Sequence, residues 1–311
     1  MRDPQRRFVE PVDKRAQAIA EKYFGIQASA HELPSERDRN FLLTTDGGQK
    51  FVLKIANAGE KEEVLEAQNA MLSHLAERVS FCPRVVPALS GEQIAVVENH
   101  FVRVLSYLPG RPFATVKFQT PELLHDFGRK LGQFSKALVG FDHPGAHRDF
   151  YWDLAKGVQG ISQFGTRIKA DWLRKMVMEV RVGPLKNLRR SVIHADANDY
   201  NVLVEEAKVV GLIDFGDVVY SYTVGELAIA VAYVVLGKEA PYAAAAPVIE
   251  GYREEFELTQ DELDALWTLV RLRLCMSVCI AAYQQQQQPE NEYLGISQNL
   301  IAETLPRLMN P

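Results

Sequence analysis

The sequence predicts an α+β protein with two unlike parts: a small antiparallel β-sheet that carries one helix, followed by a larger, mainly helical part. Its 311 residues are enough for two domains. Short strand-like apolar runs dominate the first third of the chain, whereas helical spacing prevails from Thr120 onward. A strand that breaks at Pro109-Gly110 is typical of a crossing between domains. We place the boundary so that residues 1–107 form the first part and residues 108–311 the second.

The first part begins with a helix and continues mainly as strands. Helical spacing extends over residues 13–24, and a longer amphipathic helix is predicted over residues 60–78. The turn signal Asp46-Gly47-Gly48 predicts a hairpin. Strands are predicted at 28–33, 40–45, 49–56, 84–89, 93–97 and 101–107.

The second part is predicted to be mainly helical. Thr120 followed by Pro121 is a typical helix start. Residues 224–236 are apolar nearly all round, which predicts a buried helix, and the glutamine run 284–288 is expected to be a solvated helix end or loop. Helices are predicted at 121–138, 168–182, 224–236, 241–257, 259–283 and 294–308, and a loop at 141–154.

Composition and charge exclude several classes of protein. With 47% apolar and 24% charged residues the chain can bury a core, and a net charge of −5 argues against a general nucleic-acid surface. The longest apolar run, residues 227–236, is too short to span a bilayer, and no apolar segment lies near the N-terminus. We therefore expect a cytoplasmic protein with no nucleic-acid or membrane partner.

The chemistry concentrates between Val192 and Asp217. The stretch reads VIHADANDYNVLVEEAKVVGLIDFGD, with polar clusters on either side of two apolar runs. The runs NVLV and KVVGLI are typical of the two arms of a short hairpin. Because a hairpin returns its ends to one place, we expect Asp196, Asn201 and Asp214 to converge on one small site.

This set of side chains matches the needs of phosphoryl transfer. The reaction uses a carboxylate that accepts the proton of the attacking hydroxyl, and oxygen ligands that hold magnesium against the nucleotide phosphates. An Asp, an Asn five residues later and an Asp beyond a hairpin form the catalytic loop and metal loop of kinases. Asp and Asn also favour hairpin turns, but the Asp-Phe-Gly that follows the second arm favours catalysis.

Phosphate-binding residues are expected in the first part. Lys54 lies in an apolar strand, one strand after a hairpin and just before a helix, as does the kinase lysine that grips the phosphates. A solvated lysine on an edge strand is the alternative. Kinases pair this lysine with a helix glutamate, but here Glu66 is opposite the apolar stripe and Gln68 is on it, so Gln68 is the better-placed partner.

Two further nucleotide contacts are candidates. The loop at residues 34–39 has no glycines, although Ser35 and its neighbouring backbone amides could contact phosphate. At the crossing between the two parts, backbone groups of Ser106 and Leu108 could read a purine edge, or the segment could be a plain linker.

With these residues in place, the chain resembles the aminoglycoside phosphotransferase family of small-molecule kinases. The generic segments are VLKIAN (52–57) and VIHADANDYNVLV (192–204). The segments LEAQNAMLSHL (65–75) and GLIDFGDVVYSYTVGELAIAVAY (211–233) are similar to the subgroup of hydroxylysine kinase and its bacterial relatives. The resemblance extends from about residue 28 to residue 305.

The resemblance implies a two-lobed, protein-kinase-like fold and a set of roles. It implies Asp196 as the catalytic base, Asn201 and Asp214 as Mg²⁺ ligands, and Lys54 as a phosphate contact. His194 resembles the structural histidine of the catalytic loop. The co-substrate is expected to be ATP or GTP, since nothing in these residues decides between the two.

The acceptor is expected to be a small, amine-bearing metabolite with a free hydroxyl, similar to hydroxylysine. Acids near the catalytic motifs could bind its ammonium group. They are Asp217, Asp199 and Glu226, with Asp153 and Asp149 on the preceding loop, although each could be an ordinary surface acid.

Several alternatives stay open from the sequence. Choline, homoserine, methylthioribose or an aminoglycoside could be the acceptor. The chain could instead be a nucleotide-binding regulatory protein without turnover, or a detached module of a larger fused enzyme. A homodimer also stays open.

Overall fold

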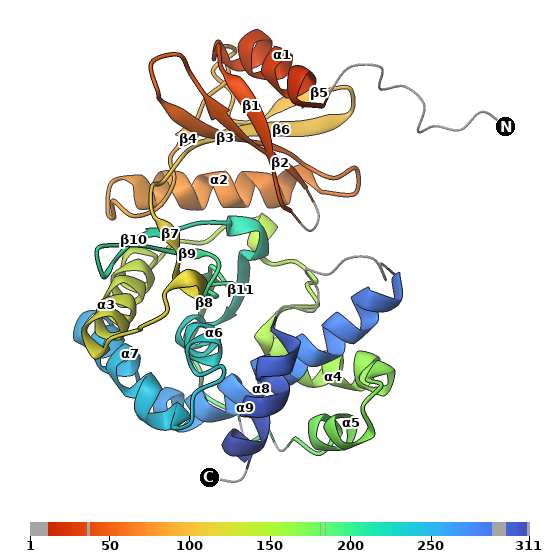
Figure 1. The fold of residues 1–311 in the computed structure, drawn as a ribbon, viewed down its shortest axis with the longest axis vertical. Coiled ribbons are helices and arrows are strands. Elements are labelled where there is room, and N and C mark those ends of the chain that lie inside the picture. The colour runs from red at the N-terminus through yellow and green to blue at the C-terminus, as the bar shows by residue number, and fades with distance from the viewer. Residues whose placement is uncertain (1–11, 36–37, 181, 184, 288–296, 310–311) are drawn as a thin grey trace, which may run out of the picture. The chain divides into compact units, whose positions relative to one another are not determined.

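The computed structural model describes residues 12–35, 38–180, 182–183, 185–287 and 297–309. The chain divides into two compact units, residues 1–109 and residues 110–311. The protein is an α+β structure, as the sequence predicts (Figure 1).

The first unit is an antiparallel sheet with a helix on each face (Figure 1). The strand order is β1-β2-β3-β6-β4, and β5 pairs with β6. The two helices are α1 (Val12–Phe24) and α2 (Glu62–Ala76). The strands are β1 (Ser29–Leu33), β2 (Arg39–Thr44), β3 (Lys50–Ile55), β4 (Val85–Val86), β5 (Ala95–Val97) and β6 (His100–Ser106).

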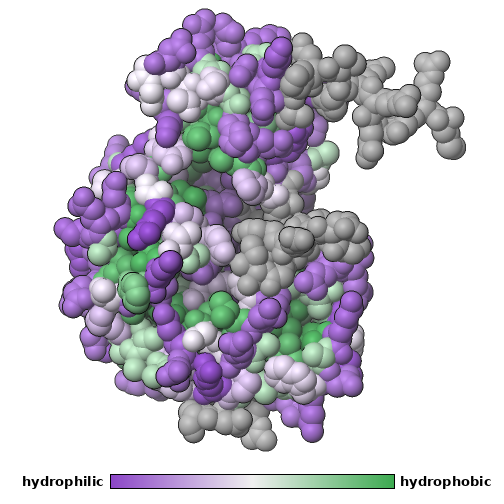
Figure 2. Space-filling view, viewed as in Figure 1, coloured by the Kyte–Doolittle hydropathy of each residue, from purple (hydrophilic) through white to green (hydrophobic). Residues whose placement is uncertain are grey.

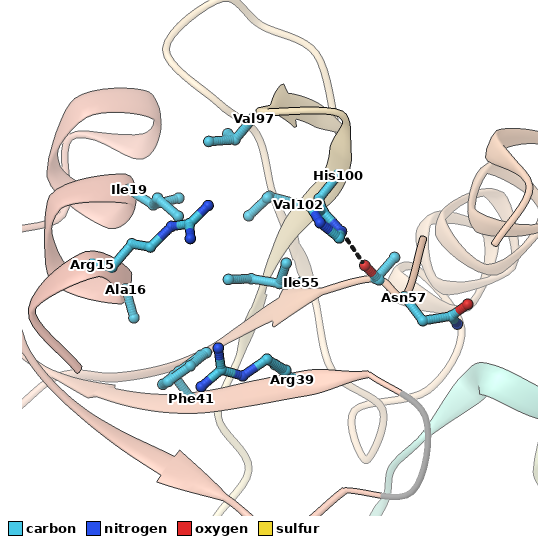
Figure 3. A pocket seen from close by; sticks show the side chains of 11 residues that line it. Arg15, Ala16, Ile19, Arg39, Phe41, Ile55, Asn57, Val97, His100 and Val102 are labelled. Atoms are coloured by element: carbon cyan, nitrogen blue, oxygen red, sulfur yellow. Dashed lines mark hydrogen bonds between the residues drawn. The ribbon is translucent and has the colours of Figure 1, made fainter. Parts of the chain in front are cut away.

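Apolar side chains of α1 and one face of the sheet form a core. Ile19 and Phe24 of α1 cluster with Phe41, Leu53 and Val102 of the strands. A cavity of about 220 Å³ lies between α1 and these strands, with apolar walls and the side chains of Arg15, Arg39 and His100 at its edge (Figure 3).

The predicted strand at 84–89 is much shorter in the structure. Only Val85 and Val86 pair with β6. Pro87 follows them directly and Pro83 precedes Arg84, and because proline lacks the N–H that a ladder needs, the pairing cannot extend past either proline.

The second unit combines small antiparallel pairings with a set of helices. Strands β10-β9-β7 form one sheet and β11-β8 another. The strands are β7 (Arg111–Pro112), β8 (Arg190–Ile193), β9 (Val202–Glu205), β10 (Lys208–Leu212) and β11 (Val219–Tyr222). The helices are α3 (Pro121–Ala137), α4 (Gly157–Phe164), α5 (Asp171–Met178), α6 (Gly225–Val234), α7 (Pro241–Glu255), α8 (Gln260–Gln287) and α9 (Gln298–Met309).

Most of these helices match the sequence prediction, with two differences. The helix predicted over 168–182 is confined to α5, because residues up to Ile168 belong to α4 and the turns that follow it. Helix α4 was not predicted, since its Gly157 and Gly160 weaken the helical signal. Gln285 to Gln287 form the exposed end of α8, one of the two predicted outcomes, while Gln288 lies outside the described residues.

Helices α6 and α8 supply the centre of the second unit. Nearly all residues of α6 are buried, as predicted, and α6 packs against α8. Among the described helices, α8 alone is long and apolar enough to cross a membrane, but 78% of its most apolar window is buried inside the protein. Figure 2 shows hydrophilic side chains over much of the visible face, with apolar patches between them.

Candidate active site

A tight hairpin joins the two loops that carry the candidate metal ligands. Strands β9 and β10 pair antiparallel with Glu205 opposite Lys208 and Val202 opposite Leu212. Glu206 and Ala207 form the turn with φ values of 46° and 61°, as in a type I′ turn. At the open end, the Ile213 N–H donates to the Asn201 carbonyl over 2.9 Å. The hairpin therefore brings Asn201 and Asp214 to the same place, as the sequence predicts.

His194 fastens the loop after β8 to this hairpin. Its Nδ1 accepts the backbone N–H of Asp196 at 3.2 Å, so its Nε2 carries the proton and donates to the Ile213 carbonyl at 3.0 Å. Its own backbone N–H donates to Glu226 Oε2 at 2.6 Å. The histidine is fully buried and acts as a structural link, the role that the resemblance implied.

Three donors orient the Asp196 carboxylate. Oδ1 accepts from Asn198 Nδ2 at 3.0 Å and from Arg273 Nη2 at 2.9 Å. Oδ2 accepts from Asn201 Nδ2 at 2.7 Å. The carboxylate therefore has a fixed direction within the loop, as a general base requires.

Negative charge accumulates around this carboxylate. Burial raises the pKa of Asp196 well above its usual range, the charges of Asp217 and Asp214 raise it further, and the Arg273 guanidinium lowers it. Asp214 directly follows Ile213, whose N–H bonds to Asn201 and whose carbonyl accepts from His194, so the two loops are joined at this point. A bound cation would offset the repulsion among the three acids.

The oxygens present fit a magnesium ion. The side-chain N–H groups of Asn201 donate to Asp196. The remaining polar atom of this amide, Oδ1, can serve as a ligand for a cation. Asp214 adds an exposed carboxylate. Mg²⁺ prefers such hard oxygens and commonly takes only one or two protein carboxylates alongside substrate phosphates.

Comparison with known proteins identifies the family. The profile of the phosphotransferase enzyme family matches residues 29–266. The chain belongs to this family. It is therefore a phosphotransferase that acts on a hydroxyl group of a small molecule.

Curated relatives of this phosphotransferase include hydroxylysine kinases. The protein from Mus musculus is 33% identical over 323 residues, covering 92% of this chain and 86% of the relative. The protein from Danio rerio is 31% identical over 318 residues, covering 93% and 89%.

Solved structures agree on the fold. Amicoumacin kinase hAmiN, in complex with AMP-PNP, Ca²⁺ and Ami, has a TM-score of 0.72 at 15% identity, covering 96% of this chain and 94% of that one. A microcompartment-associated aminopropanol kinase has a TM-score of 0.68 at 19% identity, covering 95% and 96%. The phosphotransferase thus has the two-part α+β fold that the sequence resemblance implies.

The candidate acceptor-binding acids divide into two groups. Asp217 is buried, and its charge raises the pKa of Asp196. Asp199 lies in the loop that carries Asp196, and its buried Oδ1 has no hydrogen-bond partner among the described residues. Burial raises the pKa of Asp199 to about 6.

The remaining candidate acids make contacts within the protein. Glu226 is fully buried and accepts the backbone N–H of His194, so its carboxylate supports the loop. Asp153 is buried, caps a turn through the Ala155 N–H and accepts from Ser221 Oγ. Asp149 is exposed and pairs with Lys156.

In the first unit, Lys54 is buried in β3 and Gln68 is buried on α2, while Glu66 is exposed, as the helical pattern predicts. The side-chain oxygen of Gln68 accepts from Arg103 Nη2 at 2.7 Å. Gln68 is thus held by an arginine, a partner that the sequence did not indicate.

The other nucleotide candidates have defined local contacts. Ser35 Oγ accepts from Asn40 Nδ2 at 3.1 Å. The backbone N–H of Ser106 donates to the Arg84 carbonyl, so a purine contact by Ser106 would use its carbonyl oxygen. Leu108 is half-buried just beyond it.

Arg273 is the site residue that sequence reasoning missed. It lies in the middle of α8 and is 1% exposed, yet it contacts Asp196 across 77 positions of sequence. The available signal was a pair of arginines, Arg271 and Arg273, in the apolar run LVRLRLCMSVCIAA, where a buried charge needs a specific partner.

Proposed function

We propose that the phosphotransferase transfers the γ-phosphate of ATP or GTP to the hydroxyl of a hydroxylysine-like amino acid. The observation that carries this proposal is the Asp196 carboxylate, which Asn201 holds beside the Asp214 loop. The similarity to hydroxylysine kinases over most of the chain supports the acceptor class.

Asp196 is the proposed general base. Its carboxylate would accept the proton of the acceptor hydroxyl as the oxygen attacks the γ-phosphorus, and the nucleoside diphosphate leaves. Asn201 and Asp214 would hold Mg²⁺, which when bound neutralises charge on the phosphates. Asp217 and Asp199 would face the ammonium groups of the acceptor.

The first unit would supply the nucleotide contacts. Lys54 would bind phosphate oxygens, with Gln68 fixed beside its strand by Arg103. Ser35, Ser106 and Leu108 would contribute through the backbone and the Ser35 hydroxyl. We further propose a cytoplasmic location.

A panel of acceptors tests the proposal. 5-Hydroxylysine, homoserine, choline, methylthioribose, 1-amino-2-propanol and an aminoglycoside are each incubated with ATP or GTP and MgCl₂, and release of nucleoside diphosphate is measured. The proposal expects the largest kcat/KM with 5-hydroxylysine. Turnover of another acceptor alone would replace hydroxylysine, and turnover with none would favour a regulatory nucleotide-binding role.

A further inference from the structure

The loop of residues 214–217, called the Asp214 loop, begins with an unusual backbone conformation. Asp214 has φ 63° and ψ 77°, in the left-handed region that residues with a side chain rarely adopt. Such a conformation costs free energy and persists only where the surrounding structure holds the chain. The direction of the Asp214 carboxylate, a candidate metal ligand, therefore depends on the contacts of the residues on either side.

The residue before this position is held by two hydrogen bonds. The Ile213 N–H donates to the Asn201 carbonyl at 2.9 Å, and the Ile213 carbonyl accepts from His194 Nε2 at 3.0 Å. The residue after it, Phe215, is buried, with its ring centre 4.7 Å from that of His194. The Gly216 carbonyl lies one residue further along and is held by a different segment of the chain.

Arg148 holds this carbonyl from 68 positions earlier in the sequence. Its Nη2 donates to the Gly216 carbonyl oxygen at 2.7 Å. A hydrogen bond from a charged donor is stronger than one between neutral groups. The Cζ of Arg148 lies 4.0 Å from the ring centre of Phe150, which is itself buried, so the guanidinium rests on a fixed ring.

The segment that carries Arg148 is fixed to β11, the strand that follows the Asp214 loop. The ring of His147 stacks on that of Tyr220, with centres 4.3 Å apart. Asp153 is buried and accepts a hydrogen bond from Ser221 Oγ on the same strand. Arg148 therefore lies between two attachments of its own segment, and its bond to the loop restricts the backbone there.

We propose that Arg148 is a positioning residue, which directs the Asp214 carboxylate toward a divalent cation by holding the Gly216 carbonyl. Asp196 has separate donors within the site, so loss of Arg148 would loosen the metal ligand and leave the base in place. The expected signature is weaker cation binding with little change in turnover at saturating cation. This inference rests on the proposed function, in which Asp214 holds Mg²⁺.

Cation binding without turnover provides the first test. Mn²⁺ serves as the probe, and its binding to the complex of enzyme and AMP-PNP or GMP-PNP is followed by water proton relaxation. Arg148→Met is expected to weaken Mn²⁺ binding by about 10-fold, as is typical when a residue that orients a metal ligand is lost. Arg148→Lys keeps a charged donor and should stay within about 3-fold of wild type. Arg148→Gln, which is shorter and neutral, is expected to show the loss if Arg148→Met does not fold.

Arg174→Met is the matched control. Arg174 is also half-buried and also donates to a backbone carbonyl, that of Ile168 at 3.1 Å, but it lies on α5 and pairs with Asp171. The control should bind Mn²⁺ as wild type does. Wild-type affinity in Arg148→Met, or an equal loss in Arg174→Met, would overturn the proposal.

The dependence of turnover on MgCl₂ shows which step the substitution affects. For Arg148→Met, the Mg²⁺ concentration that gives the half-maximal rate is expected to rise by about 10-fold, with kcat at saturating Mg²⁺ within about 3-fold of wild type. General damage to the fold would lower kcat at every Mg²⁺ concentration. A lower kcat with an unchanged half-maximal concentration would therefore contradict the positioning role.

A double-mutant cycle with Asp214→Asn separates this inference from the proposed function. The asparagine keeps a side-chain oxygen, so weakened Mn²⁺ binding can still be measured. Because Arg148 acts through Asp214, Arg148→Met should change the Mn²⁺ affinity of the Asp214→Asn variant by less than about 2-fold. The full 10-fold loss in that background would overturn this inference alone. Wild-type affinity in Asp214→Asn itself would reject the metal site of the proposed function and this inference with it.

Discussion

Glu226 supports the loop that carries Asp196 from inside the protein. Its carboxylate is fully buried and accepts the backbone N–H of His194, the residue that links the loop to the hairpin. Burial raises the pKa of Glu226 to about 7, although the His194 N–H and the Arg273 charge lower it. The scaffold of the site therefore contains a titratable group with a pKa near neutrality.

This pKa predicts a pH-dependent stability. The folded protein keeps the Glu226 proton up to about pH 7, whereas the unfolded chain releases it near pH 4.5. The contribution of Glu226 to the free energy of unfolding is thus fully present below about pH 4.5 and is lost as the pH rises to 7. Glu226→Gln keeps an acceptor for the His194 N–H, and we expect it to flatten this part of the stability curve.

Urea unfolding between pH 4.5 and 8 measures this effect. The difference in unfolding free energy between Glu226→Gln and wild type should change by about 3 kcal/mol across this interval, in favour of the variant at higher pH. Glu122→Gln serves as an exposed control and should follow the wild-type curve near neutral pH. A constant difference for Glu226→Gln would contradict the assignment.

At this scale the sequence predicts an arrangement of side chains when one local segment determines it. Asp196, Asn201 and Asp214 converge because a short hairpin imposes it, and hairpin spacing is visible in the sequence. The contacts of Arg273 and Glu226 with the loop join distant segments, so no local pattern reports them. The same holds for Arg103 and Gln68.

Helices α3 and α7 approach each other closely through glycines. A Cβ added at Gly128 would lie 1.9 Å from the Val248 carbonyl oxygen, and one added at Gly251 would lie 2.1 Å from the His125 carbonyl oxygen. Only glycine permits this contact, since the neighbouring atoms are backbone and cannot move aside.

We expect Gly128→Ala to destabilise the second unit by at least about 2 kcal/mol, because the helices must separate to admit a methyl group. Gly160→Ala is the matched control: it also lies in a helix, and its added Cβ would meet the Tyr151 carbonyl oxygen at an ordinary 3.8 Å. The control should be neutral or slightly stabilising. Thermal unfolding measures both, and equal midpoints would show that the helices can adjust.

Long elements were predictable and short ones were not. Helices α3, α7 and α8 follow from apolar spacing over many residues, and α6 follows from a continuous apolar run. Strand β11 has four residues and pairs with β8 across a stretch that includes the whole hairpin, so its partner cannot be inferred locally. Pro83 and Pro87 limit the length of β4, and Gly157 and Gly160 weaken the helical pattern of α4 in the sequence.

At the scale of the whole molecule, the proposed function assigns roles to residues of both units. Lys54 belongs to the sheet unit and Asp196 to the helical unit. We expect Lys54→Met to raise the KM for the nucleotide by on the order of 10- to 100-fold and to leave acceptor binding within about 2-fold. Lys50→Met, an exposed change on the same strand, is the control. An unchanged nucleotide KM in Lys54→Met would remove Lys54 from the phosphate site.

The most direct test of the account is the rate of phosphoryl transfer by Asp196→Asn. Product formation from 5-hydroxylysine is followed with saturating nucleotide and MgCl₂, and nucleotide affinity is measured in parallel. The account predicts a kcat lower by about 10³-fold or more, with nucleotide affinity within about 2-fold of wild type. A variant that retains most of its turnover would show that Asp196 is not the base and that the site lies elsewhere.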